Sequence, residues 1–293
     1  MDTRLDRLVT LYLMSPFVRL TQGTEPSVPI LMYHSISDED ESEVHPYYRT
    51  RTSATTFASH MGYLKENGYH TCSLTQALRQ LQQRSRAHPK LAVITFDDGY
   101  RDFYQQAFPL LDRHGFSATV FLPTAYVGDD AVSFKGRDCL TWAEVRELSR
   151  LGILFGSHTV THPQLYELSS PKIREEVVIS RETIEQKLGC AVDSFAYPYA
   201  FPETDDQFKT ILRDTLRSAG YQTGVCTTVG LANFGSDPLF MPRLPINSCD
   251  DDSLYEAKLN GGYDWVAKSQ YLVKLGKQWL NLPRPRSVSR QEL

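Results

Sequence analysis

The chain has 293 residues, of which 41% are hydrophobic and 23% are charged. This length excludes a peptide-sized or disulfide-stapled scaffold and leaves room for two small domains or one α/β barrel. The formal net charge of −4 argues against a protein that holds nucleic acid through phosphate contacts, so we expect no nucleic-acid partner.

The first residues predict an amphipathic helix, because five apolar side chains fall on one helical face: Leu5, Leu8, Val9, Tyr12 and Leu13. Acidic residues offset the positive charge that a secretory signal needs at its start, and the apolar run is short. We therefore expect no secretory signal and a cytoplasmic protein. No stretch of 18 apolar residues occurs, so we expect no membrane-spanning helix. We expect residues 1–27 to form a helical extension that packs on the chain's own body. Peripheral docking to the inner membrane face through residues 3–20 is the alternative.

Short apolar runs then alternate with helical patterns. The runs predict seven strands, at residues 29–34, 91–96, 118–122, 153–156, 194–197, 223–227 and 242–246. They are nearly continuous in apolar residues, as expected for strands that are covered on both faces. Helical patterns cover 56–67, 74–82, 102–114 and 205–218. A capping box at Thr141 and Glu144 predicts a further helix, and Ser170 begins another that Gly189 can end.

This alternation predicts a parallel sheet with helical crossovers, either doubly wound or closed into a barrel. About seven units favour an irregular (β/α)7-like barrel. A C-terminal helical extension and tail are expected to follow over residues 251–293. The stretch 37–52 is acidic and then basic, has no strand or helix pattern, and is expected to be a solvated loop.

Two adjacent carboxylates, Asp97 and Asp98, directly follow the apolar run at residues 91–96. Two like charges at the mouth of a buried strand repel each other and lose hydration, so one of them should resist ionisation without compensation. A metal ion would resolve this by taking one carboxylate as a ligand and leaving the other free as a base. An Asp-Gly turn without chemistry is the alternative.

Two histidines follow the predicted strand at 153–156. His158 and His162 are four residues apart and can converge on one ion. Pro163 disfavours a helical conformation at His162, so we expect a tight loop. The carboxyl ends of strands gather at one edge of α/β sheets and barrels, which should bring Asp98 and both histidines together. One carboxylate and two imidazoles leave coordination positions for water, as in catalytic metal sites.

The motifs TFDDG, SHTVTHP and FAYPYA, in this order, resemble those of the polysaccharide deacetylase family, also called the NodB-homology or carbohydrate esterase 4 family. The resemblance covers residues 28–250. It implies a deformed (β/α) barrel that removes acetyl groups from N-acetylated sugars with a divalent metal. It also implies that Asp97 is the catalytic base and that Asp98, His158 and His162 bind the metal. Zinc is the first expectation, and cobalt, nickel or manganese would suit the same ligands.

The chain departs from the family pattern in two places. The arginine that precedes Pro-Tyr in the family's third motif is missing, and we expect Arg243 to orient Asp97 in its stead, with a surface arginine as the alternative. Tyr199 aligns with the tyrosine whose backbone N–H helps to hold the oxyanion in the family. No histidine follows His162, so the family's C-terminal acid histidine is absent. His34 resembles the early histidine of the permuted poly-N-acetylglucosamine deacetylases and is expected to be the general acid, with a buried structural histidine as the alternative.

These expectations describe a metal-dependent hydrolase that releases acetate from an N-acetylhexosamine unit of a polysaccharide or of its lipid-linked precursor. No covalent acyl-enzyme is expected, because no G-x-S-x-G elbow occurs. An amidase of the same fold that acts on a formylated amino sugar or a cyclic ureide is the second interpretation. A catalytically silent sugar-binding module is the third, although a lectin gains nothing from a spare carboxylate beside a metal.

Overall fold

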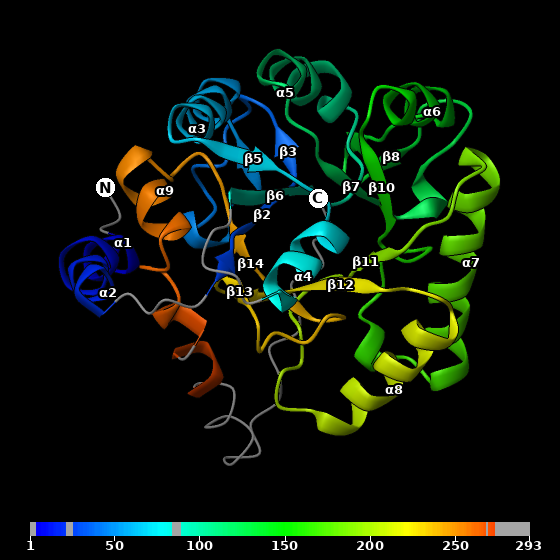
Figure 1. Ribbon diagram of the computed structural model, residues 1–293. Coiled ribbons are helices and arrows are strands. Elements are labelled where there is room, and N and C mark those ends of the chain that lie inside the picture. Colours follow the sequence, from blue (N-terminus) through cyan, green and yellow to red (C-terminus); the bar gives the residue numbers. More distant parts are fainter. Residues whose placement is uncertain (1–3, 22–25, 84–88, 268, 273–293) are drawn as a thin grey trace.

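The computed structural model describes residues 4–21, 26–83, 89–267 and 269–272. Its main strands are β2 (Ile30–Tyr33), β6 (Lys90–Phe96), β7 (Thr119–Leu122), β10 (Leu154–Ser157), β11 (Ser194–Ala196), β12 (Thr223–Val229) and β14 (Met241–Pro245). They are parallel and close into a barrel in the order β2, β14, β12, β11, β10, β7, β6, with β6 pairing back to β2 (Figure 1). The predicted irregular (β/α)7-like barrel is confirmed, and each predicted strand overlaps one of these seven.

Shorter strands extend the barrel or decorate its rim. They are β1 (Ser27–Val28) with β13 (Ala232–Asn233), β3 (Ser35–Ile36) with β4 (Arg51–Thr52), β5 (Tyr69–Thr71) beside β6, and the hairpin of β8 (Ser133–Phe134) and β9 (Arg137–Asp138). The expectation of a loop without secondary structure over 37–52 is wrong at its end. Residues 46–48 form a 3-10 turn, and β4 pairs with β3. That pairing joins segments that local composition does not connect.

Helices form the crossovers and cover the barrel. They are α3 (Ala54–Glu66), α4 (Leu74–Gln82), α5 (Phe108–His114), α6 (Trp142–Arg150), α7 (Ser170–Leu188), α8 (Asp206–Ser218) and α9 (Asp252–Leu259). The predicted capping box at Thr141 is present, and α7 ends at Gly189 in the left-handed conformation. A π-helical turn (Phe103–Ala107) precedes α5. Pro109 has no N–H to donate to that turn, which accounts for the wider ladder.

The core has two layers because side chains alternate along each strand. Along β6, Ala92, Ile94 and Phe96 pack toward the surrounding helices, whereas Val93 belongs to the cluster inside the barrel. The inner cluster also contains three side chains of α4, which lies across the barrel (Figure 1): Leu74, Ala77 and Leu81. These apolar side chains fill the amino-terminal end. The carboxyl end is left for polar groups.

The first described residues form one helical run outside the barrel: α1 (Leu5–Val9), a π-helical turn (Thr10–Met14) and α2 (Ser15–Thr21). The run lies beside α9 (Figure 1). Among the described residues, no helix is both long and apolar enough to cross a bilayer. The proposed division at residues 27 and 250 stays a prediction. Of the expected C-terminal extension and tail at 251–293, the part from residue 273 onward lies outside the described residues.

Candidate active site

A pocket of about 250 Å³ opens at the carboxyl ends of the barrel strands. Most of its lining is polar: His34, Thr50, Asp97, Asp98, Tyr100, Lys135, Arg137, His158, His162, Tyr197, Tyr199 and Thr227. Six predicted site residues therefore share one pocket although they come from four strand ends. The seventh, Arg243, is fully buried on β14 and reaches Asp97 from inside the barrel.

Strained backbone is concentrated around this pocket. Among the described residues, five that are not glycine have a positive φ: Asp98 (69°), Lys135 (51°), Thr159 (70°), His162 (56°) and Tyr199 (61°). Four of them line the pocket, and the fifth lies between the two histidines. A left-handed conformation at such residues has an energetic cost and persists only where the surroundings enforce it. The backbone is therefore bent to aim these side chains into the pocket.

Asp98, His158 and His162 form a set of metal donors. Each offers one ligand atom, and these atoms lie within 4.8 Å of one another. The Oδ1 atom of Asp98 is 3.2 Å from Nε2 of His162 and 3.6 Å from Nε2 of His158. This buried oxygen has no hydrogen-bond partner. An orphaned carboxylate oxygen that faces two imidazole nitrogens fits a divalent cation, because a buried polar atom is otherwise costly to leave unpaired.

The tautomer of His158 is held by the backbone. Its Nδ1 lies 2.8 Å from the carbonyl oxygen of Ala196, to which the protonated nitrogen donates. Nε2 therefore keeps its lone pair toward the pocket, as a metal ligand requires. Burial lowers the pKa of His158 to about 4. The ring is thus neutral at physiological pH.

The loop between the two histidines is held by a residue that the sequence did not single out. Glu176, on α7, accepts hydrogen bonds from the backbone N–H groups of Val160 and Thr161 at 2.8 and 2.9 Å. The hydroxyl of Thr159 also accepts from the N–H of His162 at 3.0 Å. The predicted tight loop is confirmed, and its anchor is a helical glutamate that local sequence does not connect to it.

Asp97 is held by a bidentate ion pair with Arg243. The guanidinium donates to both carboxylate oxygens at 2.7 Å, and Nε donates to the carbonyl of Cys226 at 3.1 Å. Burial pushes the pKa of Asp97 upward, but the charge of Arg243 outweighs it, and the pKa lies below its ordinary value. The alternative of a surface arginine is wrong, because Arg243 projects into the barrel. The carboxylate is therefore ionised and oriented.

His34 and Tyr199 line the same pocket as these groups. His34 follows β2, and burial lowers its pKa although Asp97 and Asp98 oppose the shift. Its imidazolium is thus a stronger acid than in water but less populated at neutral pH. The ring of Tyr199 packs edge-on against His162, with ring centroids 4.5 Å apart. This contact fixes one side of the donor set.

A hairpin adds two cations that sequence reasoning missed. Lys135 lies at the turn between β8 and β9, and its Nζ is 3.6 Å from Oδ2 of Asp98. Arg137, on β9, also lines the pocket. Although burial opposes the shift, His162 and Lys135 lower the pKa of Asp98 well below its usual range. The sequence Phe-Lys-Gly-Arg is compatible with a two-residue hairpin turn. Local sequence does not predict that this hairpin contacts the carboxyl ends of the barrel strands.

Comparison with known proteins connects this site to a family. Residues 84–224 match the family model described as polysaccharide deacetylase. YxkH of Bacillus subtilis, which is named after this family, is 32% identical over 209 residues, covering 70% of this chain and 66% of that protein. The poly-β-1,6-N-acetyl-D-glucosamine N-deacetylase of Escherichia coli K12 is 27% identical over 241 residues, covering 69% of this chain and 34% of that protein. This chain thus spans about a third of the Escherichia coli protein's length.

A solved structure shares the fold. The Streptococcus pyogenes deacetylase PplD, in complex with acetate, aligns with a TM-score of 0.69 and 24% sequence identity. The alignment covers 80% of this chain and 99% of that chain. The barrel and its surrounding helices are therefore a known arrangement.

Proposed function

We propose that this chain, which belongs to the polysaccharide deacetylase family, hydrolyses the N-acetyl amide of an N-acetylhexosamine unit and releases acetate. One observation carries the proposal. The three donor residues converge at one strand edge, and a second carboxylate, Asp97, stands beside them with both oxygens held by Arg243. A base that is separate from the donor set is what metal-assisted amide hydrolysis needs.

The donor set fits a divalent metal, with zinc first among zinc, cobalt, nickel and manganese. Asp98, His158 and His162 would hold it through the atoms that already face one another. When bound, such an ion lowers the pKa of a water molecule and polarises an acyl oxygen.

The chain's own residues divide the remaining work. Asp97 accepts the proton of the water that attacks the acetyl carbon, since it is ionised and lies 4.0 Å from Nε2 of His158. The backbone N–H of Tyr199 donates to the oxygen that becomes negative. His34, as imidazolium, donates a proton to the nitrogen when the C–N bond breaks. Acetate and a free amino sugar are the products.

The volume of the pocket limits how much of a substrate it can enclose. About 250 Å³ lies below the range of pockets that enclose drug-sized ligands, so it suits a single sugar unit. The rest of a glycan or a lipid-linked carrier would lie outside the pocket. The name of the Escherichia coli relative supports an N-acetylglucosamine polymer, and we propose that its lipid-linked precursor is an equal candidate. The expected cytoplasmic location stays a prediction.

Product detection tests the proposal. Purified chain, loaded with zinc, should release acetate from short β-1,6-linked N-acetylglucosamine oligomers. Asp97→Asn should bind the metal and release none, which makes it the matched control for contaminating activity. Release of formate or ammonia from a formylated amino sugar or a cyclic ureide, without acetate, would instead favour the second interpretation. Oligomer binding without any turnover by the metal-loaded chain would favour a silent binding module.

A further inference from the structure

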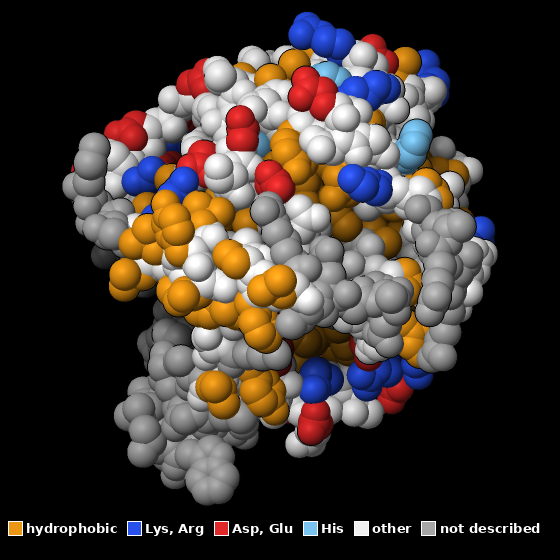
Figure 2. Space-filling view, turned by 60° about the vertical axis from the view of Figure 1, so that its left-hand side comes forward, with side chains coloured by type: hydrophobic (Ala, Val, Ile, Leu, Met, Phe, Trp, Pro, Cys, Tyr) orange, Lys and Arg blue, Asp and Glu red, His pale blue; other side chains and the backbone are white. Residues whose placement is uncertain are grey.

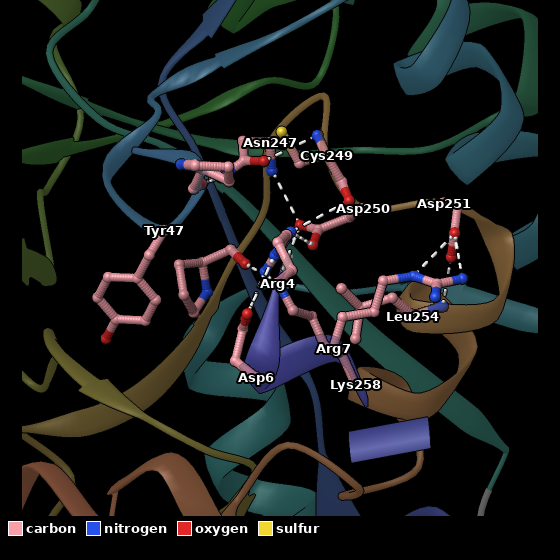
Figure 3. Close-up of polar contacts among 12 residues, drawn as sticks. Arg4, Asp6, Arg7, Tyr47, Asn247, Cys249, Asp250, Asp251, Leu254 and Lys258 are labelled. Atoms are coloured by element: carbon pink, nitrogen blue, oxygen red, sulfur yellow. Dashed lines mark hydrogen bonds and ion pairs between the residues drawn. The ribbon is translucent and has the colours of Figure 1, made fainter. Parts of the chain in front are cut away.

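The N-terminal helical run is attached to the body through its polar side chains. Arg4 donates to the carbonyl of Cys249 at 3.1 Å and to Oδ1 of Asp250 at 3.3 Å, and Asp250 is fully buried (Figure 3). One turn and a half further on, the indole N–H of Trp265 donates to the hydroxyl of Thr10 at 3.0 Å. Thr10 has no exposed surface. The polar face of the run therefore points inward.

Two more contacts hold the run close to the body. Arg7 donates to Oδ2 of Asp251 at 2.6 and 3.0 Å (Figure 3). A Cβ atom on Gly262 would lie 2.5 Å from Oγ of Ser15, so a larger residue there would force Ser15 to shift. The attachment is thus specific, and the run has one orientation on the body.

The outward face of the run is apolar. We call it the apolar N-terminal face, and it consists of large exposed side chains: Leu5 (72% exposed), Leu8, Tyr12, Leu13 (66%), Phe17 and Leu20 (86%). Hydrophobic side chains gather over this part of the molecule in Figure 2. An ordinary surface helix buries its apolar stripe and exposes its polar one. This run instead exposes its apolar side chains and turns polar ones inward. A contiguous exposed apolar patch marks a site of contact with a membrane or another protein.

The sequence after the last described residue, Leu272, has a net positive charge. Trp265 contacts the run through Thr10, and the last described residues, Tyr271 and Leu272, are exposed and apolar. The segment that follows them, 273–293, contains five lysines and arginines and one glutamate. The basic segment therefore continues from a part of the body that touches the run.

We propose that the apolar N-terminal face docks on the surface of a bilayer that contains anionic lipids. Apolar side chains that enter the interface and a basic segment in the same chain are two signals that together give stable peripheral binding. A second copy of the chain would carry the same net positive charge over residues 273–293 and so offers this segment no charge complementarity. An anionic bilayer suits both the apolar N-terminal face and the net positive charge of residues 273–293.

Docking would hold the chain at a bilayer through a run that is anchored beside the edge of the pocket. Asn247–Asp251 follows β14 at its carboxyl end, which is the edge where the pocket opens. The N–H of Ser248 donates to the carbonyl of Arg51, next to Thr50 in the pocket wall. This consequence rests on the proposed function, because it matters only if the substrate lies at a membrane. The docking itself does not depend on it.

Vesicle sedimentation with the full chain tests the proposal. We expect binding to phosphatidylcholine vesicles that contain phosphatidylglycerol, weaker binding without it, and a decrease as salt rises. The triple variant Leu5→Gln, Leu13→Gln and Leu20→Gln should partition at least about tenfold less. The matched control is Leu151→Gln, Leu154→Gln and Ile179→Gln, because these exposed apolar residues lie elsewhere on the body. The control should bind as the unmodified chain does.

Both triple variants should retain the circular dichroism spectrum and acetate release from soluble oligomers, which separates docking from folding and from the proposed function. Absence of binding to anionic vesicles by the unmodified chain would overturn the proposal. So would equal losses in the two triple variants. Self-association in sedimentation velocity that the first variant alone abolishes would identify a second copy as the occupant instead.

Discussion

Arg243→Met tests whether the buried ion pair with Asp97 supports both stability and chemistry. Arg243 has no exposed surface and Asp97 is 3% exposed, and two bonds of 2.7 Å join them. The substitution removes the guanidinium and leaves the carboxylate of Asp97 buried without a cationic partner. Removing one partner of a buried pair costs about 3–5 kcal/mol, against a total of about 5–15 kcal/mol for a typical domain. We expect a fall in the free energy of unfolding of that size.

Urea unfolding at neutral pH of the unmodified chain, Arg243→Met, Asp97→Leu and the double variant provides the measurement. The double variant removes the orphaned charge and should recover most of the lost stability, since apolar replacement of both partners is often neutral. Arg243→Lys keeps the charge but not the two-pronged geometry, so it should be more stable than Arg243→Met and still release acetate slowly. A double variant whose loss equals the sum of the two single losses would refute the reasoning, because the pair would then contribute no coupling.

Three further predictions concern the donor set, the acid and the N-terminal attachment. Asp98→Asn should lose most of its metal in elemental analysis after dialysis, whereas Asp97→Asn should keep it; equal losses would contradict the division of roles. His34→Ala should keep the metal and lower kcat by about 10²–10⁴, and a rate near that of the unmodified chain would move the acid role elsewhere. Although burial opposes the shift, Arg4 lowers the pKa of Asp6 to about 2. Its stabilising contribution is therefore present above the unfolded pKa of about 3.9 and is lost as the pH falls through about 2. The difference in urea midpoint between the unmodified chain and Asp6→Asn should shrink on acidification, and a constant difference would argue against the pairing.

Much of the candidate site follows from local sequence. Asp97, Asp98 and His158 each lie within two residues of the end of an apolar run, and parallel strands deliver such residues to one edge. That rule needs only the position of each strand end. Arg243 is different, because β2 lies between β14 and β6 in the barrel. Sequence left it open between an inward partner of Asp97 and a surface residue, and only closure of the barrel brings the two side chains together.

Residues outside the strand ends could not be found in this way. Lys135 reaches Asp98 because a hairpin folds over the pocket, and Glu176 reaches the histidine loop from the side of a helix. Each contact depends on how a surface element packs. Neither the spacing nor the residue type carries that information.

The N-terminal run shows the same division. Its amphipathic pattern predicted a helix that packs on the body, and the run does pack there, but with Thr10 inward and Leu13 outward. Local sequence predicted the seven barrel strands, the crossover helices and the donor residues, because these depend on side-chain periodicity and on neighbours a few residues away. The tertiary structure decided the pairing of Arg243 with Asp97 and the outward direction of the apolar face. Both depend on contacts between segments more than a hundred residues apart. Patterns over a few neighbouring residues do not predict such contacts.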